Sequence, residues 1–233
     1  MRPRLAVPAV AVVVAAVCLA AVPAASAATG APEMQRLAAE QTKLLFRELK
    51  GPQVASPLDC KRGQRENGIL GVFMLPTLSF GSGDRTFHCR TARHTVLLDQ
   101  GGGIATEDNR PDSTWTFEDE SVVDFNRANL DRICDDVLAR FFSAPAPATV
   151  DGARVTTGTA IATKPFIGIY KAYNPGTWWE DSIALGHPGR LATTYCGWKA
   201  PITLAKGRHE IAIDLSAVAG APTRFTYDIL VTR

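Results

Sequence analysis

The sequence lacks the short motifs that mark the common catalytic and metal sites. It has no Gly-x-Ser-x-Gly, no His-x-His, no His-Glu-x-x-His and no Cys-x-x-Cys. The serine of Gly81-Ser82-Gly83 has the wrong spacing for a nucleophile, and Gly101-Gly102-Gly103 lacks the Lys-Ser/Thr of a phosphate-binding loop. The motifs therefore identify no catalytic residue, and we expect no bound metal ion and no cofactor.

Histidine is also scarce, and the acidic residues have no recognisable ligand spacing. His88 precedes Cys89, but neighbouring residues of a strand face opposite sides, which argues against a paired nucleophile. Two acidic clusters, at residues 107–112 and 118–124, offer the oxygen ligands that calcium prefers without the spacing of an EF-hand loop. Aspartate and asparagine are common in turns, so we expect solvated loops there, with calcium binding left open.

The chain has no large excess of either charge. Lys and Arg number 25, Asp and Glu number 23, and Arg2 and Arg4 lie within the first 27 residues. A chain without that segment carries 23 residues of each sign, so its overall charge gives no reason to expect nucleic acid or an acidic membrane as a partner. Arginine outnumbers lysine 18 to 7, which is typical of a high-GC genome and favours a bacterial source.

One long apolar run is present, and it lies at the N-terminus. Arg2 and Arg4 precede an apolar segment over residues 5–22, and Ala25-Ser26-Ala27 follows. Positive charge, an apolar run and a small-x-small site are the parts of a secretory signal peptide. We therefore expect cleavage after about Ala27 and a secreted, extracellular protein without stable membrane insertion. An uncleaved anchor and a lipid-modified Cys18 are the alternatives.

Few cysteines remain beyond the leader, and their number is even. They are Cys60, Cys89, Cys134 and Cys196, and an even set in an exported chain is typical of disulfides. Sequence alone does not fix their connectivity. We expect Cys60–Cys89, which brackets a candidate strand pair, and Cys134–Cys196, which ties a helix to the C-terminal strands. A zinc ion held by the four thiolates is the competing interpretation, and the spacing disfavours it.

Two segments have the apolar spacing of amphipathic helices. The first covers about residues 32–50, begins near Pro32 and ends at Gly51-Pro52. The second covers about residues 125–141, with Asp124 or Asn126 as the candidate N-cap. Cys134 falls on the apolar stripe of this second helix, so its sulfur should point into the core, as expected of a structural disulfide.

The rest of the chain has the pattern of short β-strands separated by glycine and proline turns. Residues 69–75 form an apolar run typical of a buried strand, and Gly101-Gly102-Gly103 suggests a break between two strands. Asp151-Gly152 is a two-residue hairpin signal, and Pro165 places the strand over 161–170 at an edge or a bulge. Further strands are expected at residues 85–91, 94–99, 191–198, 209–215 and 224–231.

This pattern predicts a mostly β protein: a single β-sandwich or jelly-roll-like domain with two accessory α-helices. We expect a signal peptide over residues 1–27, an N-terminal helical segment over residues 28–58 and a disulfide-stapled sandwich over residues 59–233. A domain of that length is large enough to bury a sizeable core.

A set of short stretches also carries a resemblance to a known family. They lie at residues 68–75, 86–91, 133–137, 151–152, 186–189, 195–198, 204–209 and 225–229. Through them the chain resembles a family of uncharacterised secreted bacterial β-rich proteins with no known activity. The resemblance implies an apolar strand after the first cysteine and a Leu-x-x-Gly-x-His turn before the last two strands. It supports a single β domain and the first disulfide, and it assigns no catalytic residue.

The aromatic segment over residues 170–198 is the strongest candidate for a ligand-binding surface. It holds three of the four tryptophans and three of the four tyrosines. Aromatic faces stack on sugars while charged neighbours bond their hydroxyls, although Trp and Tyr also complete sandwich cores. Trp178 and Trp179 are adjacent, so in an extended segment one would face inward and one outward. The candidate ligand residues are Tyr173, Trp178, Trp179, Glu180, Asp181, His187 and Arg190.

Three functions are compatible with these features. The first is a non-catalytic secreted module that binds a glycan, a cell-envelope component or a protein. The second is a structural or inhibitory extracellular protein that acts through an exposed apolar patch. The third is a secreted glycan-acting hydrolase with a carboxylate pair. The absence of catalytic motifs places the binding module first, and the sequence fixes neither its ligand nor its oligomeric state.

Overall fold

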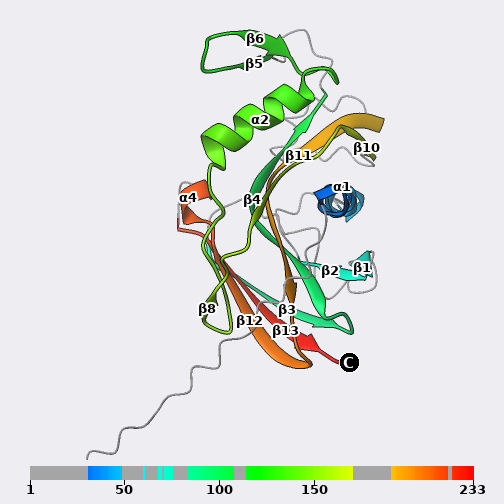
Figure 1. Cartoon of the computed structure of the whole chain (residues 1–233), viewed down its shortest axis with the longest axis vertical. Helices are drawn as coiled ribbons and strands as arrows, with labels where there is room; N and C mark the ends of the chain where they lie inside the picture. Colours follow the sequence, from blue (N-terminus) through cyan, green and yellow to red (C-terminus); the bar gives the residue numbers. More distant parts are fainter. Residues whose placement is uncertain are drawn as a thin grey trace, which may run out of the picture.

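The fold is a sandwich of two mixed β-sheets with helices on the larger sheet (Figure 1). It is described from a computed structural model. That structure describes residues 31–48, 60, 68–69, 71–75, 83–107, 114–169, 190–219 and 222–233. The expected mostly β, sandwich-like domain with two main helices is confirmed.

Sheet A is the larger sheet and is built around two long antiparallel strands, β4 and β11. Its strand order is β1-β2-β4-β11-β10, and β9 pairs with the same edge of β11 as β10. The strands are β1 (Gly68–Ile69), β2 (Val72–Met74), β4 (Thr95–Thr106), β9 (Thr159–Ala162), β10 (Phe166–Ile169) and β11 (Arg190–Thr203).

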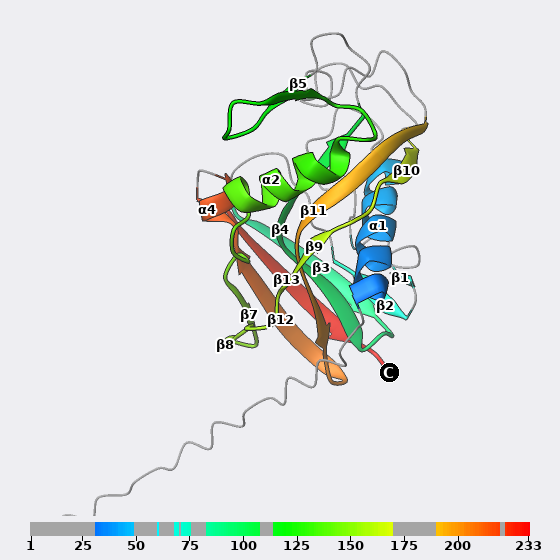
Figure 2. The same cartoon turned by 45° about the horizontal axis from the view of Figure 1, so that its top comes forward.

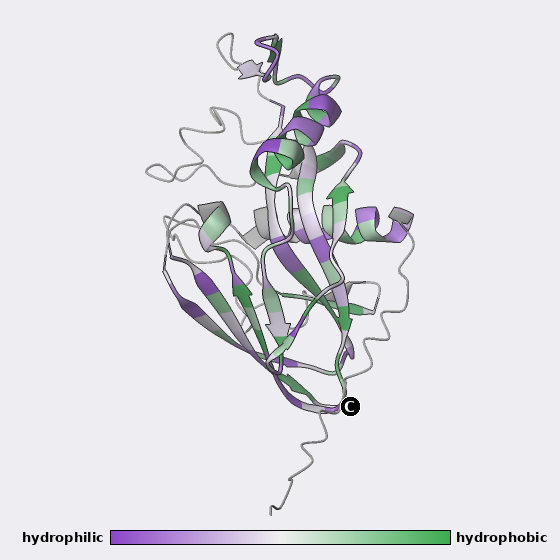
Figure 3. Cartoon of the chain, turned by 60° about the vertical axis from the view of Figure 1, so that its left-hand side comes forward, coloured by the Kyte–Doolittle hydropathy of each residue, from purple (hydrophilic) through white to green (hydrophobic). Residues whose placement is uncertain are grey.

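Sheet B has the order β3-β13-β12-β7-β8 and packs face to face with the lower half of sheet A (Figure 2). Along β13, alternate residues are buried in the core, and the residues between them are exposed or partly exposed. Hydrophobic and hydrophilic residues accordingly alternate along the strands of sheet B (Figure 3). The strands are β3 (Arg85–Thr91), β7 (Ala148–Val150), β8 (Ala153–Arg154), β12 (Gly207–Asp214) and β13 (Arg224–Val231).

The main core lies between the two sheets. Val96 and Leu98 of β4 face Phe225, Tyr227 and Ile229 of β13, and all five are buried. Burial of such side chains stabilises each by about 1.5–3 kcal/mol relative to exposure, so this layer supplies much of the driving force for folding.

Helix α1 (Ala31–Glu48) covers the other face of sheet A. Its buried residues Met34 and Leu37 pack against Met74, Leu97 and other residues whose neighbours in sequence face sheet B. Figures 1 and 2 show the helix lying along β11 and β10. The helix expected over residues 32–50 is therefore present over Ala31–Glu48, and its expected end at residues 49–52 lies outside the described residues. The helix extends the core and does not stand apart from the sheets.

Helix α2 (Leu130–Phe141) packs on the upper part of sheet A, where the β5–β6 hairpin (Thr114–Thr116 and Val122–Asp124) also joins it. The helix begins later than expected, after the N-cap residue Asn129, so the proposed caps Asp124 and Asn126 were wrong. Asn126 instead closes the preceding turn: its backbone and side-chain oxygens both accept a hydrogen bond from the Asn129 amide. A short helix, α4 (Ser216–Ala219), precedes β13.

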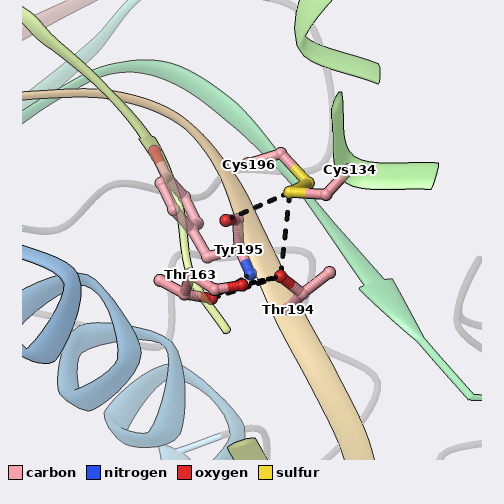
Figure 4. The surroundings of a disulfide bond; sticks show 5 residues. All are labelled: Cys134, Thr163, Thr194, Tyr195 and Cys196. Atoms are coloured by element: carbon pink, nitrogen blue, oxygen red, sulfur yellow. Dashed lines mark hydrogen bonds between the residues drawn. A yellow bond between two sulfur atoms is a disulfide. The ribbon is translucent and has the colours of Figure 1, made fainter. Parts of the chain in front are cut away.

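Both expected disulfides are present. Cys60 is bonded to Cys89 of β3, and Cys134 of α2 is bonded to Cys196 of β11. In the second pair both cysteines are fully buried, and Thr194, from the same strand, donates a hydrogen bond to the carbonyl of Thr163 beside them (Figure 4). This disulfide fixes α2 to the central strand of sheet A.

The glycine run at residues 101–103 does not break the chain, contrary to expectation. It continues β4 as a bulged segment: Gly102 pairs with Gly197, and Asp99 pairs with Lys199. Gly101 has a φ of 104°, which suits the extra residue of the bulge. Glycine is needed at position 102 because the Tyr195 side chain of β11 lies against the β4 backbone.

The strands expected at residues 85–91, 191–198, 209–215 and 224–231 are present as β3, β11, β12 and β13, with β11 continuing to Thr203. The Asp151-Gly152 hairpin is confirmed, with both residues at positive φ, and Pro165 lies at a bulge between β9 and β10 on the edge of β11. The single strand expected over residues 69–75 is instead the tight hairpin β1–β2, which turns at Gly71 with a φ of 82°.

Candidate functional site

The outer face of sheet B carries a hollow of about 450 Å³. Because Phe225, Tyr227 and Ile229 point into the core, the residues between them point outward. The hollow is formed by three strands, β3, β12 and β13. Its lining residues are His88, Cys89, Arg90, Arg208, His209, Glu210, Asp228, Ile229 and Leu230.

Strand register arranges the outward residues in two rows across the hollow. Leu230 pairs with Arg90 on one side and with Arg208 on the other, which places an apolar side chain between two arginines. The next row is His88, Asp228 and Glu210 in the same strand order. Cross-strand partners have Cβ atoms about 4.5–5.5 Å apart, so each row forms one continuous surface.

The two rows differ in whether their polar side chains pair with each other. His88 Nδ1 lies 2.8 Å from Asp228 Oδ2, in a pair whose side chains are 70% and 48% exposed. Such an exposed pair contributes about 0–1 kcal/mol to stability. Within the described part of the chain, Arg90 and Arg208 have no hydrogen bond or ion pair to another side chain. Their guanidinium groups are therefore available to an external anion.

Most of the surface expected at residues 170–198 cannot be compared with the structure. Arg190 is the only candidate ligand residue among the described ones, and it is exposed at the first position of β11, opposite Ile169. The other six lie outside the described residues: Tyr173, Trp178, Trp179, Glu180, Asp181 and His187. Ligand binding by this segment stays a prediction.

Two aromatic residues of that segment are described, and both have structural roles. Tyr195 is 3% exposed and donates its hydroxyl hydrogen bond to Asp99 Oδ1 at 2.9 Å. Trp198 donates from Nε1 to the Phe142 carbonyl at 2.6 Å, which joins β11 to the end of α2. Tyr195 is thus a core residue, as the alternative interpretation expected, whereas Trp198 is only partly buried.

The acidic and histidine candidates are also accounted for where they are described. Asp119 accepts hydrogen bonds from the backbone amide and hydroxyl of Ser121, which lower the pKa of its carboxyl, and the segment forms the β5–β6 turn. His94 bonds the Leu204 carbonyl, and His209 lies between Asp151 and the Ala205 carbonyl. Among the described residues, no group of three His, Cys, Asp or Glu side chains gathers as a metal site would require.

A second polar cluster, which the sequence interpretation missed, is buried between α1 and sheet A. Lys199 Nζ lies 2.5 Å from Asp99 Oδ2 and 2.6 Å from Gln41 Oε1. Asp99 Oδ1 accepts hydrogen bonds from the Tyr195 hydroxyl and from the Gly101 amide, the latter at 3.2 Å. The lysine side chain is 1% exposed and the aspartate side chain 9%. The sequence signal that could have revealed this cluster is a charged residue among the apolar residues of each strand: Asp99 in β4 and Lys199 in β11.

Burial sets the electrostatics of this cluster. Desolvation lowers the pKa of Lys199, and the nearby Asp99 opposes that effect. Desolvation, with the Asp99 charge and hydrogen bond as further causes, raises the pKa of Tyr195 well above its usual value. Tyr195 therefore stays a neutral hydrogen-bond donor to Asp99 at every physiological pH.

Two glycines make room for this arrangement. A Cβ atom on Gly102 or on Gly197 would lie 2.3 Å from the Tyr195 hydroxyl oxygen. The hydroxyl therefore reaches Asp99 only because β4 and β11 both carry glycine there. This explains the glycines at positions 102 of β4 and 197 of β11.

Comparison with known proteins does not identify a family for this chain. The chain matches no protein-family model, and neither curated proteins nor solved structures give a match. The resemblance to secreted bacterial β-rich proteins thus stays a prediction. Among the described residues, no helix is both long enough and apolar enough to cross a bilayer.

Proposed function

We propose that the chain is an exported, non-catalytic binding module whose sheet B face binds an acidic glycan of the cell envelope or its surroundings. The observation that carries the proposal is the row Arg90–Leu230–Arg208, in which two arginines without described partners flank an apolar side chain. Arginine binds carboxylate and phosphate groups through two parallel hydrogen bonds. Leu230 offers an apolar surface for the ring of a sugar between them.

The second row complements this interaction. Glu210 and the His88–Asp228 pair are exposed or half-buried beside the arginines, where they can accept and donate hydrogen bonds to hydroxyl groups. A neutral polymer would use this row alone, whereas a uronic acid polymer would use both. We therefore assign acidic saccharides as the preferred ligand class.

Export is part of the same proposal. It is supported by the leader-like residues 1–27 and by the two disulfides, which form and persist in oxidising compartments. An extracellular module would meet envelope and matrix polysaccharides directly.

The test is calorimetric titration with an oligomer of galacturonic acid, with a neutral glucose oligomer as the reference. We expect binding to the acidic oligomer that weakens with added salt, because partly exposed charges are screened. Arg90→Ala combined with Arg208→Ala should weaken it at least about tenfold, given about 1.5–3 kcal/mol for each charged hydrogen bond. Arg154→Ala, at an exposed position on β8 outside the hollow, is the matched control.

The competing functions have less support among the described residues. Glu210 and Asp228 are cross-strand partners on one open face, and Asp228 is bound to His88, whereas a glycosidase places two acids on either side of its substrate. The exposed large hydrophobic residues described are Val122 and Phe141, too few for an apolar docking patch. Release of reducing ends from the oligomer during the titration would favour the hydrolase instead.

A further inference from the structure

We propose that Lys199 and Asp99 join covalently, as an isopeptide bond between the two central strands of sheet A. This goes beyond the proposed binding function and does not depend on it. The two residues are direct partners in the β4–β11 register, and Lys199 Nζ is 2.5 Å from Asp99 Oδ2. The amine is thus held against the carboxyl group that it would attack, which removes most of the entropic barrier to reaction.

The reaction needs no external oxidant or co-reactant. Transfer of one proton from the Lys199 ammonium to Asp99 gives a neutral amine and a carboxylic acid. The amine nitrogen then attacks Cγ of Asp99, and the C–Oδ2 bond breaks. Oδ2 leaves as water with the acid proton and one proton from nitrogen, which leaves a neutral amide. One lysine and one aspartate side chain therefore become one amide and one water molecule.

The dry surroundings favour the neutral amine of Lys199 that reacts. The Lys199 and Asp99 side chains lie beneath α1, beside the buried residues Leu97 and Tyr195. Two charges in a medium of low dielectric constant are each costly to bury, and their mutual attraction offsets that cost only in part. Desolvation also lowers the pKa of Lys199, which raises the share of free amine. Conversion to an amide removes both buried charges.

The carboxyl group is held as an activated acyl group should be. Asp99 Oδ1 accepts a hydrogen bond from the Tyr195 hydroxyl at 2.9 Å and another from the Gly101 amide at 3.2 Å. Oδ1 is the oxygen that becomes negative when nitrogen attacks Cγ, so these two donors form an oxyanion hole. The bulge at Gly101 and the two glycines beside the Tyr195 hydroxyl bring both donors to one oxygen.

Gln41 of α1 positions the amine. Its Oε1 accepts a hydrogen bond from Lys199 Nζ at 2.6 Å, and its Nε2 donates to the Leu75 carbonyl at 3.1 Å. The side-chain amide of the glutamine is therefore held by a hydrogen bond at each end, and it keeps the Lys199 amine next to Asp99. After the reaction the same oxygen can accept from the new amide N–H, so the product keeps the contact.

The bond would serve an exported protein as a clamp. It would join β4 and β11 close to the point where Cys134–Cys196 joins α2 to β11. Unlike a disulfide, an amide survives a reducing environment. The centre of sheet A would then resist unfolding even when both disulfides are open.

Intact mass spectrometry of the purified full-length or processed wild-type protein, after reduction of the disulfides, tests the proposal directly. We expect a mass one water molecule below that of the sequence between the observed ends. Trypsin should yield a branched peptide that joins the segments containing Asp99 and Lys199, without cleavage after Lys199. The full mass of the sequence, without loss of water and with cleavage after Lys199, would overturn the proposal.

Variants separate the bond from other losses of water. Lys199→Arg keeps the positive charge and cannot form this amide, so it should show the full sequence mass whether or not it folds. Tyr195→Phe removes one donor to Asp99 Oδ1, and we expect it to slow bond formation at least about tenfold in freshly made protein. Loss of water that persists in Lys199→Arg would place the modification elsewhere and contradict the assignment.

Discussion

At the scale of single residues, the region around the Tyr195 hydroxyl is tightly packed. Its oxygen fits between the backbones of Gly102 and Gly197 and reaches Asp99. A methyl group on Gly102 would collide with it at 2.3 Å and with the Cys196 carbonyl at 2.8 Å. We predict that Gly102→Ala destabilises the protein by about 1–3 kcal/mol, because an overpacked core must shift its backbone.

The neighbouring glycine provides the control for this prediction. A Cβ on Gly103 would meet the edge of the Phe142 ring at 3.3 Å, and that partly exposed ring can move. Gly103→Ala should therefore change stability by less than about 1 kcal/mol in urea unfolding. Equal effects of the two substitutions would show that the Tyr195 hydroxyl does not set the packing here.

A second residue-scale prediction concerns Asp119 in the β5–β6 turn. Hydrogen bonds from Ser121 lower the pKa of its carboxyl below the usual 3.8. The folded protein thus binds that proton less readily than the unfolded chain, so this stabilisation is present above pH 3.8 and is lost as the pH falls below it. In an NMR titration Ser121→Ala should raise the Asp119 midpoint, and an unchanged midpoint would refute the assigned cause.

At the scale of elements, the docking of α1 includes a buried polar residue, Gln41, that hydrogen-bonds to groups outside the helix. Gln41 bonds both the Leu75 carbonyl and Lys199. Gln41→Ala would leave these buried groups without that partner, so we predict a loss of about 1–3 kcal/mol and faster hydrogen exchange within α1. The adjacent Glu40, which forms a partly exposed pair with Lys43, is the control, and Glu40→Ala should cost less than about 1 kcal/mol.

The two disulfides should contribute unequally. Cys60–Cys89 closes a separation of 29 residues and Cys134–Cys196 one of 62. In the chain-entropy account their removal costs about 3.5 and about 4.3 kcal/mol, because the longer loop restricts the unfolded chain more. Guanidinium unfolding of the two double-alanine variants measures this difference. A larger loss of unfolding free energy on removal of Cys60–Cys89 would contradict the chain-entropy account. It would mean that the contacts of α2 compensate for the missing Cys134–Cys196 bond.

At the scale of the whole molecule, local patterns predicted most of the scaffold. The alternation along β12 and β13, the apolar stripe of α2 and the Asp151-Gly152 turn are each encoded in a few neighbouring residues. These features depend on short-range spacing, which a single sequence displays. The two disulfides match the expected pairs, although the sequence alone left their connectivity open.

Features that depend on distant partners were not predictable in this way. The glycine run in β4 has the sequence pattern of a strand break, and only the contact of Gly102 with the Tyr195 hydroxyl explains it within a strand. Lys199 contacts Asp99, which is 100 residues away in the sequence, and Gln41, which is 158 away, so the residues near Lys199 do not identify these partners. The hollow on sheet B likewise depends on the parallel pairing of β3 with β13, which brings Arg90 beside Leu230.

The central claim is that the sheet B face binds an acidic saccharide, and NMR spectroscopy with an oligomer of galacturonic acid tests it at the residues concerned. We predict ligand-dependent shifts of the Arg90 and Arg208 Nε–H signals and of the Leu230 methyl signals, while Arg154 on the same sheet stays unchanged. Shifts confined to the indole signals of Trp178 and Trp179, with Arg90 and Arg208 unaffected, would contradict the account.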